Sequence, residues 1–274
     1  MNTTPSGDIP FYGVLKRDIS ATMIEKAVEE IRNLGFTVVP SGFSDAELKI
    51  ISERFDLLRL EYAKKFGESY LENIDEHNTL RLPLAFDSCF LDLAANSNVI
   101  EIISKLIVGK FILNQQNGII NPAGKIYNQG AWHRDLPYQH FVSSTPLAIN
   151  ALFCVDEFNL NNGATHVLPA SHRQESFPSD AYIIKNEVQV KAAAGSFILI
   201  DCMAFHRGGR NLSEKNRRAV NHVYTIPLMK QQIDIPAILS NMDFDAKVKD
   251  LLGFKYKVPQ SIEAFLLSRE LTGL

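Results

Sequence analysis

The segment Trp132-His133-Arg134-Asp135-Leu136 places an imidazole and a carboxylate two positions apart. Alternate side chains of a β-strand point to the same face, so His133 and Asp135 can reach one metal ion. A second imidazole, His206, follows an apolar, strand-like run at residues 195–201. Two imidazoles and one carboxylate can hold non-haem Fe(II) on one face and leave three positions open for a co-substrate and oxygen. The pattern predicts a metal-dependent oxygenase.

A basic residue extends this pattern. Arg217 lies eleven residues after His206 and is followed by Arg218. A guanidinium pairs bidentately with a carboxylate, which is how the far end of a dicarboxylate co-substrate would be held. Taken alone, each residue has a simpler explanation: Arg217 as a solvated surface arginine, and His206 as a histidine satisfied by local hydrogen bonds. Only the combination favours a site.

Composition limits the remaining possibilities. The 274 residues are 46% hydrophobic and 22% charged, which suffices for a sizeable core, and we expect one domain spanning residues 1–274. The net charge of −3 lacks the basic excess that is typical of proteins that bind nucleic acid. The three cysteines (Cys89, Cys154 and Cys202) stand in apolar surroundings typical of buried reduced thiols. We find neither a leader-like N-terminus nor a long apolar run, so we expect a cytoplasmic protein without a membrane partner.

The first part of the chain, about residues 20–108, has a helical pattern. Helices are predicted at 22–34, where Gly35 ends the helix, from a capping box at Ser44–Glu47, and at about 97–106. Residues 36–40 form a short β-branched run that predicts a strand. The polar stretch 68–78 has no clear pattern.

The pattern changes after Gly109. From about residue 109 to 228, short apolar or alternating runs bounded by turn residues predict strands of a sandwich or barrel, at 111–120, 147–155, 165–168, 182–184, 187–190, 196–200 and 219–226. A helical tail follows at about 229–274. Its predicted helix, 261–271, could pack on the β core, close a site or mediate dimerisation, so a monomer and a homodimer both remain open.

Several motifs agree in order with one family. Between the two metal-binding motifs lies Asn162-Gly163-Ala164-Thr165-His166-Val167-Leu168-Pro169-Ala170-Ser171-His172. After them come His206-Arg207-Gly208-Gly209-Arg210-Asn211 and Arg217-Arg218-Ala219-Val220. Over roughly residues 22–228, the chain resembles the phytanoyl-CoA dioxygenase family of Fe(II)- and 2-oxoglutarate-dependent oxygenases. It departs from the family at Ala170, where glycine is usual, and at Gly208, where some relatives carry a serine that touches the co-substrate.

The resemblance implies a mainly β fold, a double-stranded β-helix (jelly-roll, cupin-like) core with N-terminal helices. It implies that His133, Asp135 and His206 bind iron and that Arg217 binds the distal carboxylate of 2-oxoglutarate. Arg217 is preferred over Arg218 because of its spacing from His206 and because strand alternation leaves Ala219 and Asn221 on its face. Asn150 is a second candidate contact for 2-oxoglutarate, with a polar core residue as the alternative.

The candidates for the substrate pocket flank these motifs: Trp132, Tyr138, Gln139 and His166. Trp132 is equally well explained as a core residue. The other histidines, His77, His140, His172 and His222, are not expected to bind metal. Basic residues near the motif ends could attract an anionic small molecule: Lys125, Arg134, Arg207 and Arg210.

The resemblance implies hydroxylation of an unactivated C–H bond in a small-molecule metabolite or natural-product intermediate, while 2-oxoglutarate and O₂ are converted to succinate and CO₂. Asp135 favours hydroxylation over halogenation, because related halogenases carry a small residue in its place; desaturation and cyclisation stay open. A hydrolase or isomerase using Zn²⁺ or Mn²⁺ could employ the same ligands, but it leaves Arg217 unexplained. A non-catalytic binding protein on the same fold would not require all three ligands.

Overall fold

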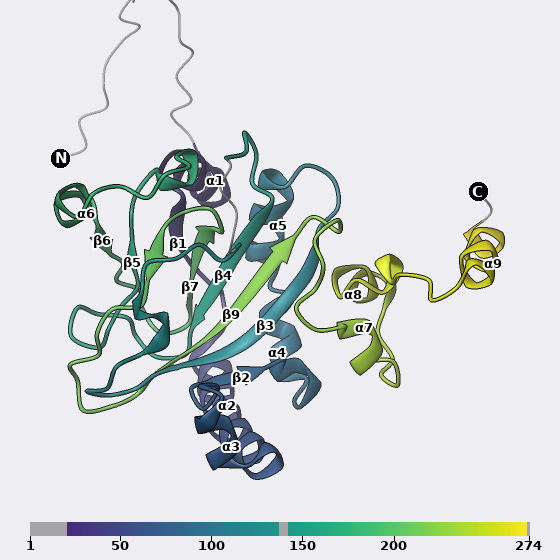
Figure 1. Cartoon of the computed structure of the whole chain (residues 1–274), viewed down its shortest axis with the longest axis horizontal. Helices are drawn as coiled ribbons and strands as arrows, with labels where there is room; N and C mark the ends of the chain where they lie inside the picture. Colours follow the sequence, from purple (N-terminus) through teal and green to yellow (C-terminus); the bar gives the residue numbers. More distant parts are fainter. Residues whose placement is uncertain (1–20, 137–141, 273–274) are drawn as a thin grey trace, which may run out of the picture.

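The computed structural model describes residues 21–136 and 142–272, and within them two antiparallel sheets form the centre (Figure 1). The larger sheet has the strand order β1-β7-β4-β9-β3-β2 and the smaller β6-β5-β8. The strands are β1 Phe36–Pro40, β2 Thr79–Arg81, β3 Ile112–Asn121, β4 Ala148–Cys154, β5 His166–Val167, β6 Val188–Gln189, β7 Ser196–Asp201, β8 His206–Arg207 and β9 Arg217–Thr225. The predicted β core is confirmed.

Apolar side chains fill the space between the two sheets. Val167 of β5 lies in one buried cluster with Ile198 and Ile200 of β7 and Ala219 of β9. Ile200, from the larger sheet, also lines a cavity together with His206 of the smaller sheet. The cavity therefore lies between the sheets, where alternation along each strand directs every second side chain.

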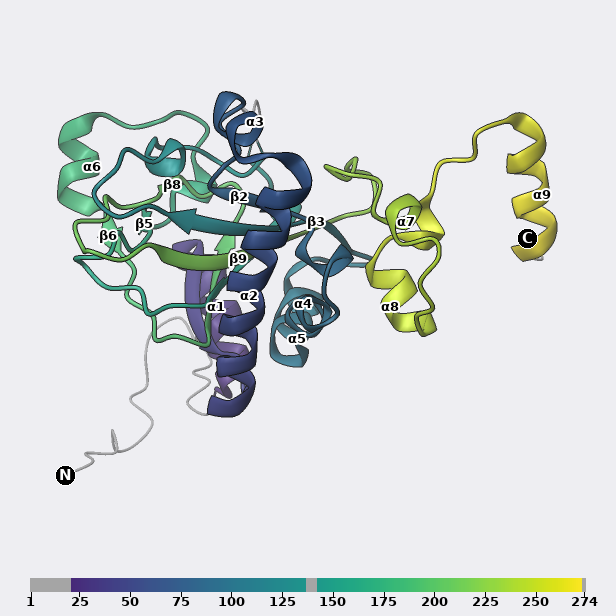
Figure 2. The same ribbon diagram turned by 90° about the horizontal axis from the view of Figure 1, so that it is seen from below.

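Helices cover the opposite face of the larger sheet (Figure 2). Phe153 of β4 and Phe197 of β7 are buried in the same cluster as Phe55 and Ile102, which come from two of these helices. Each fully buried apolar side chain contributes roughly 1.5–3 kcal/mol. The helices thus stabilise the larger sheet, whose other face lines the cavity. Their bounds are α1 Met23–Leu34, α2 Asp45–Phe66, α4 Cys89–Ala94 and α5 Ser97–Leu106.

Local sequence signals fix the ends of the predicted helices. Thr22 caps α1 and Ser44 caps α2, each in a reciprocal capping box with a glutamate three residues later. Gly35 ends α1 with φ of 85°, a left-handed conformation that favours glycine. These predictions and the helix at 97–106 are confirmed.

Three local expectations differ from the structure. Residues 182–184, predicted as a strand, lie in α6 (Asp180–Asn186), where only Ile183 is buried; the alternating apolar pattern is too short to distinguish a strand from one helical turn. The poorly patterned stretch contains α3 (Glu68–Asn73). The segment from His133 to Asp135 has only a single bridge, at His133, in place of the expected strand.

The C-terminal tail, about residues 229–272, contains three helices. It contains α7 (Ile235–Ile238), α8 (Ala246–Leu251) and α9 (Ile262–Thr272). Figures 1 and 2 both show α9 standing away from the sheets. Among the described helices, none combines the length and the apolar character needed to cross a membrane.

Candidate active site

Backbone hydrogen bonds join the two segments that carry the predicted metal ligands. The backbone N–H groups of His133 and His206 each donate to the other residue's carbonyl, with N···O distances of 2.9 and 3.0 Å. The N–H of Asp135 donates to the carbonyl of Cys202 at 3.1 Å, just past the end of β7. Main-chain hydrogen bonds therefore position all three residues before any side chain contributes.

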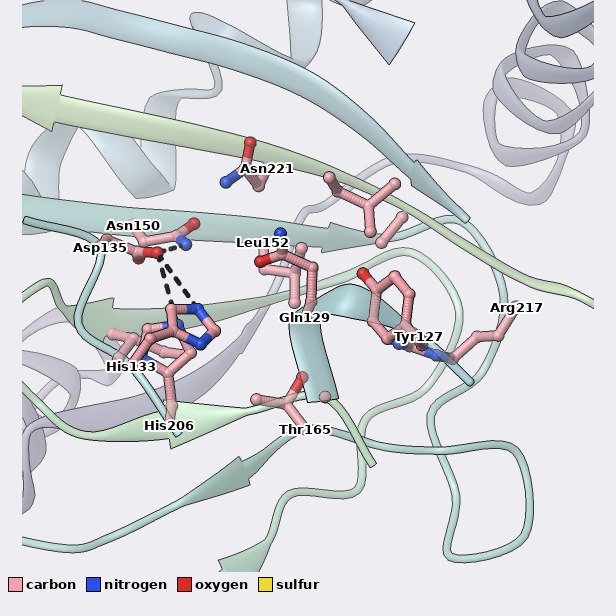
Figure 3. A pocket seen from close by; sticks show the side chains of 14 residues that line it. Tyr127, Gln129, His133, Asp135, Asn150, Leu152, Thr165, His206, Arg217 and Asn221 are labelled. Carbon is pink, nitrogen blue, oxygen red and sulfur yellow. Dashed lines mark hydrogen bonds and ion pairs between the residues drawn. The ribbon is translucent and has the colours of Figure 1, made fainter. Parts of the chain in front are cut away.

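The three side chains converge on one point (Figure 3). Oδ1 of Asp135 lies 3.5 Å from Nε2 of His206 and 3.9 Å from Nε2 of His133. All three candidate ligand atoms lie within 4.8 Å of one another. Ligands at right angles around an ion with bonds of about 2.1 Å are about 3 Å apart. The two distances from Asp135 are therefore longer than this value by less than about 1 Å, so small side-chain movements would bring its carboxylate and each imidazole to the separation that a first-row metal requires.

Neighbouring groups orient each ligand. Nδ1 of His133 lies 2.8 Å from the carbonyl oxygen of Ala131, and Nδ1 of His206 lies 3.0 Å from that of Ala204. Because a carbonyl only accepts, each Nδ1 carries a hydrogen and each Nε2 faces Asp135. Nδ2 of Asn150 donates to Oδ2 of Asp135 at 2.7 Å, which leaves Oδ1 as the atom that faces both imidazoles.

The three groups shift one another's pKa values. Burial lowers the pKa of His133, and the adjacent His206 lowers it further. Burial alone would raise the pKa of Asp135, but His206, His133 and the hydrogen bond from Asn150 bring it to about 2. Burial also opposes charge on His206, yet Asp135 raises its pKa. An ionised carboxylate between two imidazoles is a donor set that fits Fe(II).

A cavity of about 60 Å³ adjoins the three ligands and reaches β9. Besides the ligands, it is lined by Ile119, Tyr127, Gln129, Asn150, Leu152, Thr165, Ile200, Gly208, Arg217, Ala219 and Asn221. Apolar side chains form much of the wall, and Arg217 contributes a guanidinium to it. The structure thus brings Arg217 and Asn150 to the same cavity as His133, Asp135 and His206.

The guanidinium of Arg217 is buried without a protein carboxylate to match it. The residue is 4% exposed, and among the described residues its Nε and Nη1 have no hydrogen-bond partner. It lies over the ring of Phe158, 3.7 Å from the centroid. Burial lowers its pKa, which means that the charged form is less favourable there than in water. Such a group fits a ligand that brings its own carboxylate.

Arg218, the next residue along β9, is paired with protein carboxylates. It forms ion pairs with Asp156 at 2.7 Å and with Asp56 at 2.8 Å, and it donates to Ser52. Strand alternation therefore directs Arg218 outward and Arg217 inward, as the sequence indicated. Ala219 and Asn221 share the cavity face with Arg217.

Sequence reasoning missed three polar residues of the cavity wall. Tyr127 and Gln129 lie in the turn just before the His133 segment, and Thr165 directly precedes β5. Only their nearness to the motifs could have drawn attention to them.

The predicted pocket residues are placed differently. Trp132 packs against Phe177, with ring centroids 6.2 Å apart, and His166 bonds to Glu187 at 2.8 Å. Neither Trp132 nor His166 lines the cavity beside the ligands. Tyr138, Gln139 and also His140 lie outside the described residues.

Two of the basic residues near the motifs have protein partners. Arg134 is buried and donates to the backbone carbonyls of Met203 and Glu175, at 2.7 and 3.2 Å, so its role is structural. Arg207 pairs with Glu187 at 3.0 Å. Lys125 and Arg210 are exposed.

The remaining described histidines are engaged elsewhere. Nδ1 of His222 faces the carbonyl of Ala151 at 3.0 Å, and Nε2 of His172 faces that of Arg32 at 3.2 Å. His77 contacts Asn78. Among the described residues, none of these three histidines joins the group of candidate metal ligands.

The two departures from the family pattern have structural counterparts. Ala170 adopts φ of 61°, a left-handed conformation in which glycine is less strained. A Cβ atom on Gly208 would lie 2.7 Å from Cε1 of Tyr127. The ring of Tyr127 therefore occupies the space that a side chain at position 208 would need.

Comparisons with known proteins agree with this geometry. Residues 31–219 match the family model described as phytanoyl-CoA dioxygenase (PhyH). An uncharacterised protein of Mycobacterium tuberculosis, Rv1501, is 29% identical over 252 residues, which cover 89% of this chain and 92% of that protein. The crystal structure of EctD from S. alaskensis with 2-oxoglutarate and 5-hydroxyectoine has a TM-score of 0.63 at 19% identity and covers 78% of this chain and 79% of that one. The α-ketoglutarate-dependent carbocyclase SnoK from nogalamycin biosynthesis has a TM-score of 0.59 at 17% identity, covering 82% and 94%.

Proposed function

The chain belongs to the phytanoyl-CoA dioxygenase family of Fe(II)- and 2-oxoglutarate-dependent oxygenases, and from that premise we propose that it hydroxylates an unactivated C–H bond of a small molecule. Fe(II) would be held by His133, Asp135 and His206. Arg217 would hold the distal carboxylate of 2-oxoglutarate, and Asn150 would contact the co-substrate near the metal. The substrate would be a metabolite or a natural-product intermediate.

One observation carries the proposal: a buried guanidinium, whose Nε and Nη1 have no partner among the described residues, shares a cavity with two imidazoles and a carboxylate. A hydrolase with the same metal ligands does not require a buried arginine at the other end of the cavity. A binding protein requires neither the ligand set nor its orientation by backbone carbonyls. A keto acid with a distal carboxylate would bind the metal through its keto-acid end and Arg217 through its distal carboxylate.

When bound, iron with 2-oxoglutarate and O₂ supplies an oxidation in which one oxygen atom enters the substrate C–H bond, and the other enters succinate as CO₂ leaves. The protein's part is positioning. Asn150 holds Oδ2 of Asp135, so that Oδ1 alone faces the imidazoles. The carbonyls of Ala131 and Ala204 keep both Nε2 atoms directed at the metal position. Ile119 and Leu152 make part of the wall apolar and exclude water from the reacting bond.

Fe(II) held by His133, Asp135 and His206 would keep room for the keto-acid end of 2-oxoglutarate and for oxygen. The carboxylate of Asp135 would take the place that a halide would need, which favours hydroxylation over halogenation. Cyclisation, the reaction that the name of the carbocyclase SnoK states, is the alternative outcome. Product analysis that found chlorinated material in the presence of chloride would contradict hydroxylation.

We further propose an anionic substrate. Of the four basic residues near the motif ends, Lys125 and Arg210 keep exposed side chains that could attract one, whereas Arg134 and Arg207 are engaged with protein groups. A substrate search in a metabolite extract that recovered only neutral ligands would remove this part of the proposal.

The decisive experiment is an anaerobic titration of the purified protein with Fe(II) and 2-oxoglutarate. The readout is the weak visible metal-to-ligand charge-transfer band of the chelated keto acid. We expect the band in the wild type, its loss in Asp135→Ala and its weakening in Arg217→Ala. Arg218→Ala is the matched control and should keep the band, because its side chain points away from the cavity.

The absence of a band despite bound metal would favour a Zn²⁺ or Mn²⁺ hydrolase. The absence of metal binding would favour a non-catalytic binding protein. Equal loss in Arg217→Ala and Arg218→Ala would show that the effect comes from general damage to β9.

A further inference from the structure

A tyrosine ring forms the cavity wall beside Arg217. Tyr127 precedes the short 3-10 helix Asn128–Gly130, and its carbonyl accepts from the N–H of Gly130 at 2.9 Å. The carbonyl of Gln129 accepts from the N–H of Gly208 at 2.7 Å, which ties this turn to the end of β8. The ring then lies against the backbone of Gly208, where even a methyl group would come within 2.7 Å of Cε1. Glycine at position 208 allows this placement.

The hydroxyl of Tyr127 is available for a ligand. Figure 3 shows it directed into the cavity. Within the described part of the chain, this hydroxyl makes no hydrogen bond to another protein group, although Arg217 is close enough for its charge to act on Tyr127. Burial raises the pKa of Tyr127, so the hydroxyl stays protonated and can donate.

We propose that the Tyr127 hydroxyl donates a hydrogen bond to the distal carboxylate of 2-oxoglutarate, beside the guanidinium of Arg217. This inference rests on the proposed function. A carboxylate offers about four lone-pair sites, and a guanidinium fork satisfies two of them. Tyr127 is the candidate for a further donor because its hydroxyl is directed into the cavity and the charge of Arg217 acts on it, whereas the wall residues Ile119 and Ala219 offer no donor. Together the two residues select keto acids that carry a second carboxylate.

The test is an anaerobic calorimetric titration of the Fe(II)-loaded protein and its Tyr127→Phe variant with 2-oxoglutarate and with pyruvate. Pyruvate has the same keto-acid end but no distal carboxylate. Loss of a hydrogen bond to a charged group should weaken 2-oxoglutarate binding by about tenfold, which corresponds to about 1.4 kcal/mol. Pyruvate binding should change less than twofold. The variant's preference for 2-oxoglutarate over pyruvate should therefore fall by about tenfold.

Tyr224→Phe is the matched control. It also removes a buried hydroxyl, which donates to the carbonyl of Ala94 at 2.7 Å and lies away from the cavity. We expect it to lower stability and leave both affinities unchanged.

Two results would overturn the role of Tyr127. One is 2-oxoglutarate affinity in Tyr127→Phe within twofold of the wild type; the other is an equal loss for both keto acids, which would place the effect at the metal. If the proposed function itself is wrong, the result differs from both of these, because the wild type would then show no preference for 2-oxoglutarate over pyruvate.

Discussion

Replacing Arg217 with methionine should stabilise the ligand-free protein and abolish its response to 2-oxoglutarate. Methionine keeps much of the side-chain volume and removes a charge that is 4% exposed and lacks partners at Nε and Nη1. Arg218→Met provides the contrast, because Arg218 has carboxylate partners at 2.7 and 2.8 Å. Two adjacent arginines of one strand are thus expected to respond in opposite directions.

The magnitudes follow from their surroundings. A buried charged group without partners costs about 3 kcal/mol, and the contact of Arg217 with Phe158 offsets up to about 2 kcal/mol of this. Arg217→Met should therefore gain about 1 kcal/mol, or about 2–4 °C in Tm for a chain of this size. Arg218→Met loses charge-assisted hydrogen bonds at a partly exposed site, so we expect a loss of about 1–2 kcal/mol.

Thermal unfolding with and without ligand tests both halves of this prediction. With Fe(II) present and 2-oxoglutarate at about 100 times its Kd, a binding-competent protein should gain about 2.7 kcal/mol. The wild type and Arg218→Met should show this gain, and Arg217→Met should show little of it. The reasoning is refuted if Arg217→Met melts below the wild type without ligand and still shows the full gain with 2-oxoglutarate.

Three further changes test other parts of the structure. Ala170→Gly should raise the free energy of unfolding by about 0.5–1 kcal/mol in urea denaturation, because the left-handed φ of 61° strains alanine; an unchanged or lower value would contradict this. Burial lowers the pKa of His222 from 6.5 to about 4, so the unfolded chain binds the proton first and stability should fall by about 3 kcal/mol between about pH 6.5 and 4. This loss should be absent from metal-free His222→Asn, and equal pH slopes would refute it. Gly208→Ala should displace the ring of Tyr127 and weaken 2-oxoglutarate binding about tenfold, whereas Gly130→Ala, whose nearest neighbour would be 3.9 Å away, should leave it unchanged; similar affinities in the two variants would count against this packing.

Much of the site was predictable because it depends on local order. The spacing of His133 and Asp135, the strand end before His206 and the alternation around Arg217 are properties of short segments. Each is ambiguous alone, and their order along the chain made the combination specific. Helix ends were predictable for the same reason, since the capping boxes at Thr22 and Ser44 involve neighbours in sequence.

Other features depend on contacts between distant segments. The strand predicted at 182–184 is helical because no neighbouring strand pairs with it, and a three-residue pattern cannot reveal that. Trp132 and His166 flank the motifs in sequence but pack beside Phe177 and Glu187, away from the cavity wall. Nearness along the chain did not predict which side chains share the cavity.

The sequence by itself determined the candidate metal ligands, the inward direction of Arg217 and the mainly β core, because residue chemistry and strand periodicity are local. Only the tertiary structure decided that His133 pairs its backbone with His206, that Asn150 holds Asp135, and that Tyr127 fills the space above Gly208. It also decided that, among the residues that the structure describes, no carboxylate pairs with Arg217 while two pair with Arg218. Whether a charge is satisfied depends on which distant residues the fold brings to it, and one segment's sequence does not contain that information.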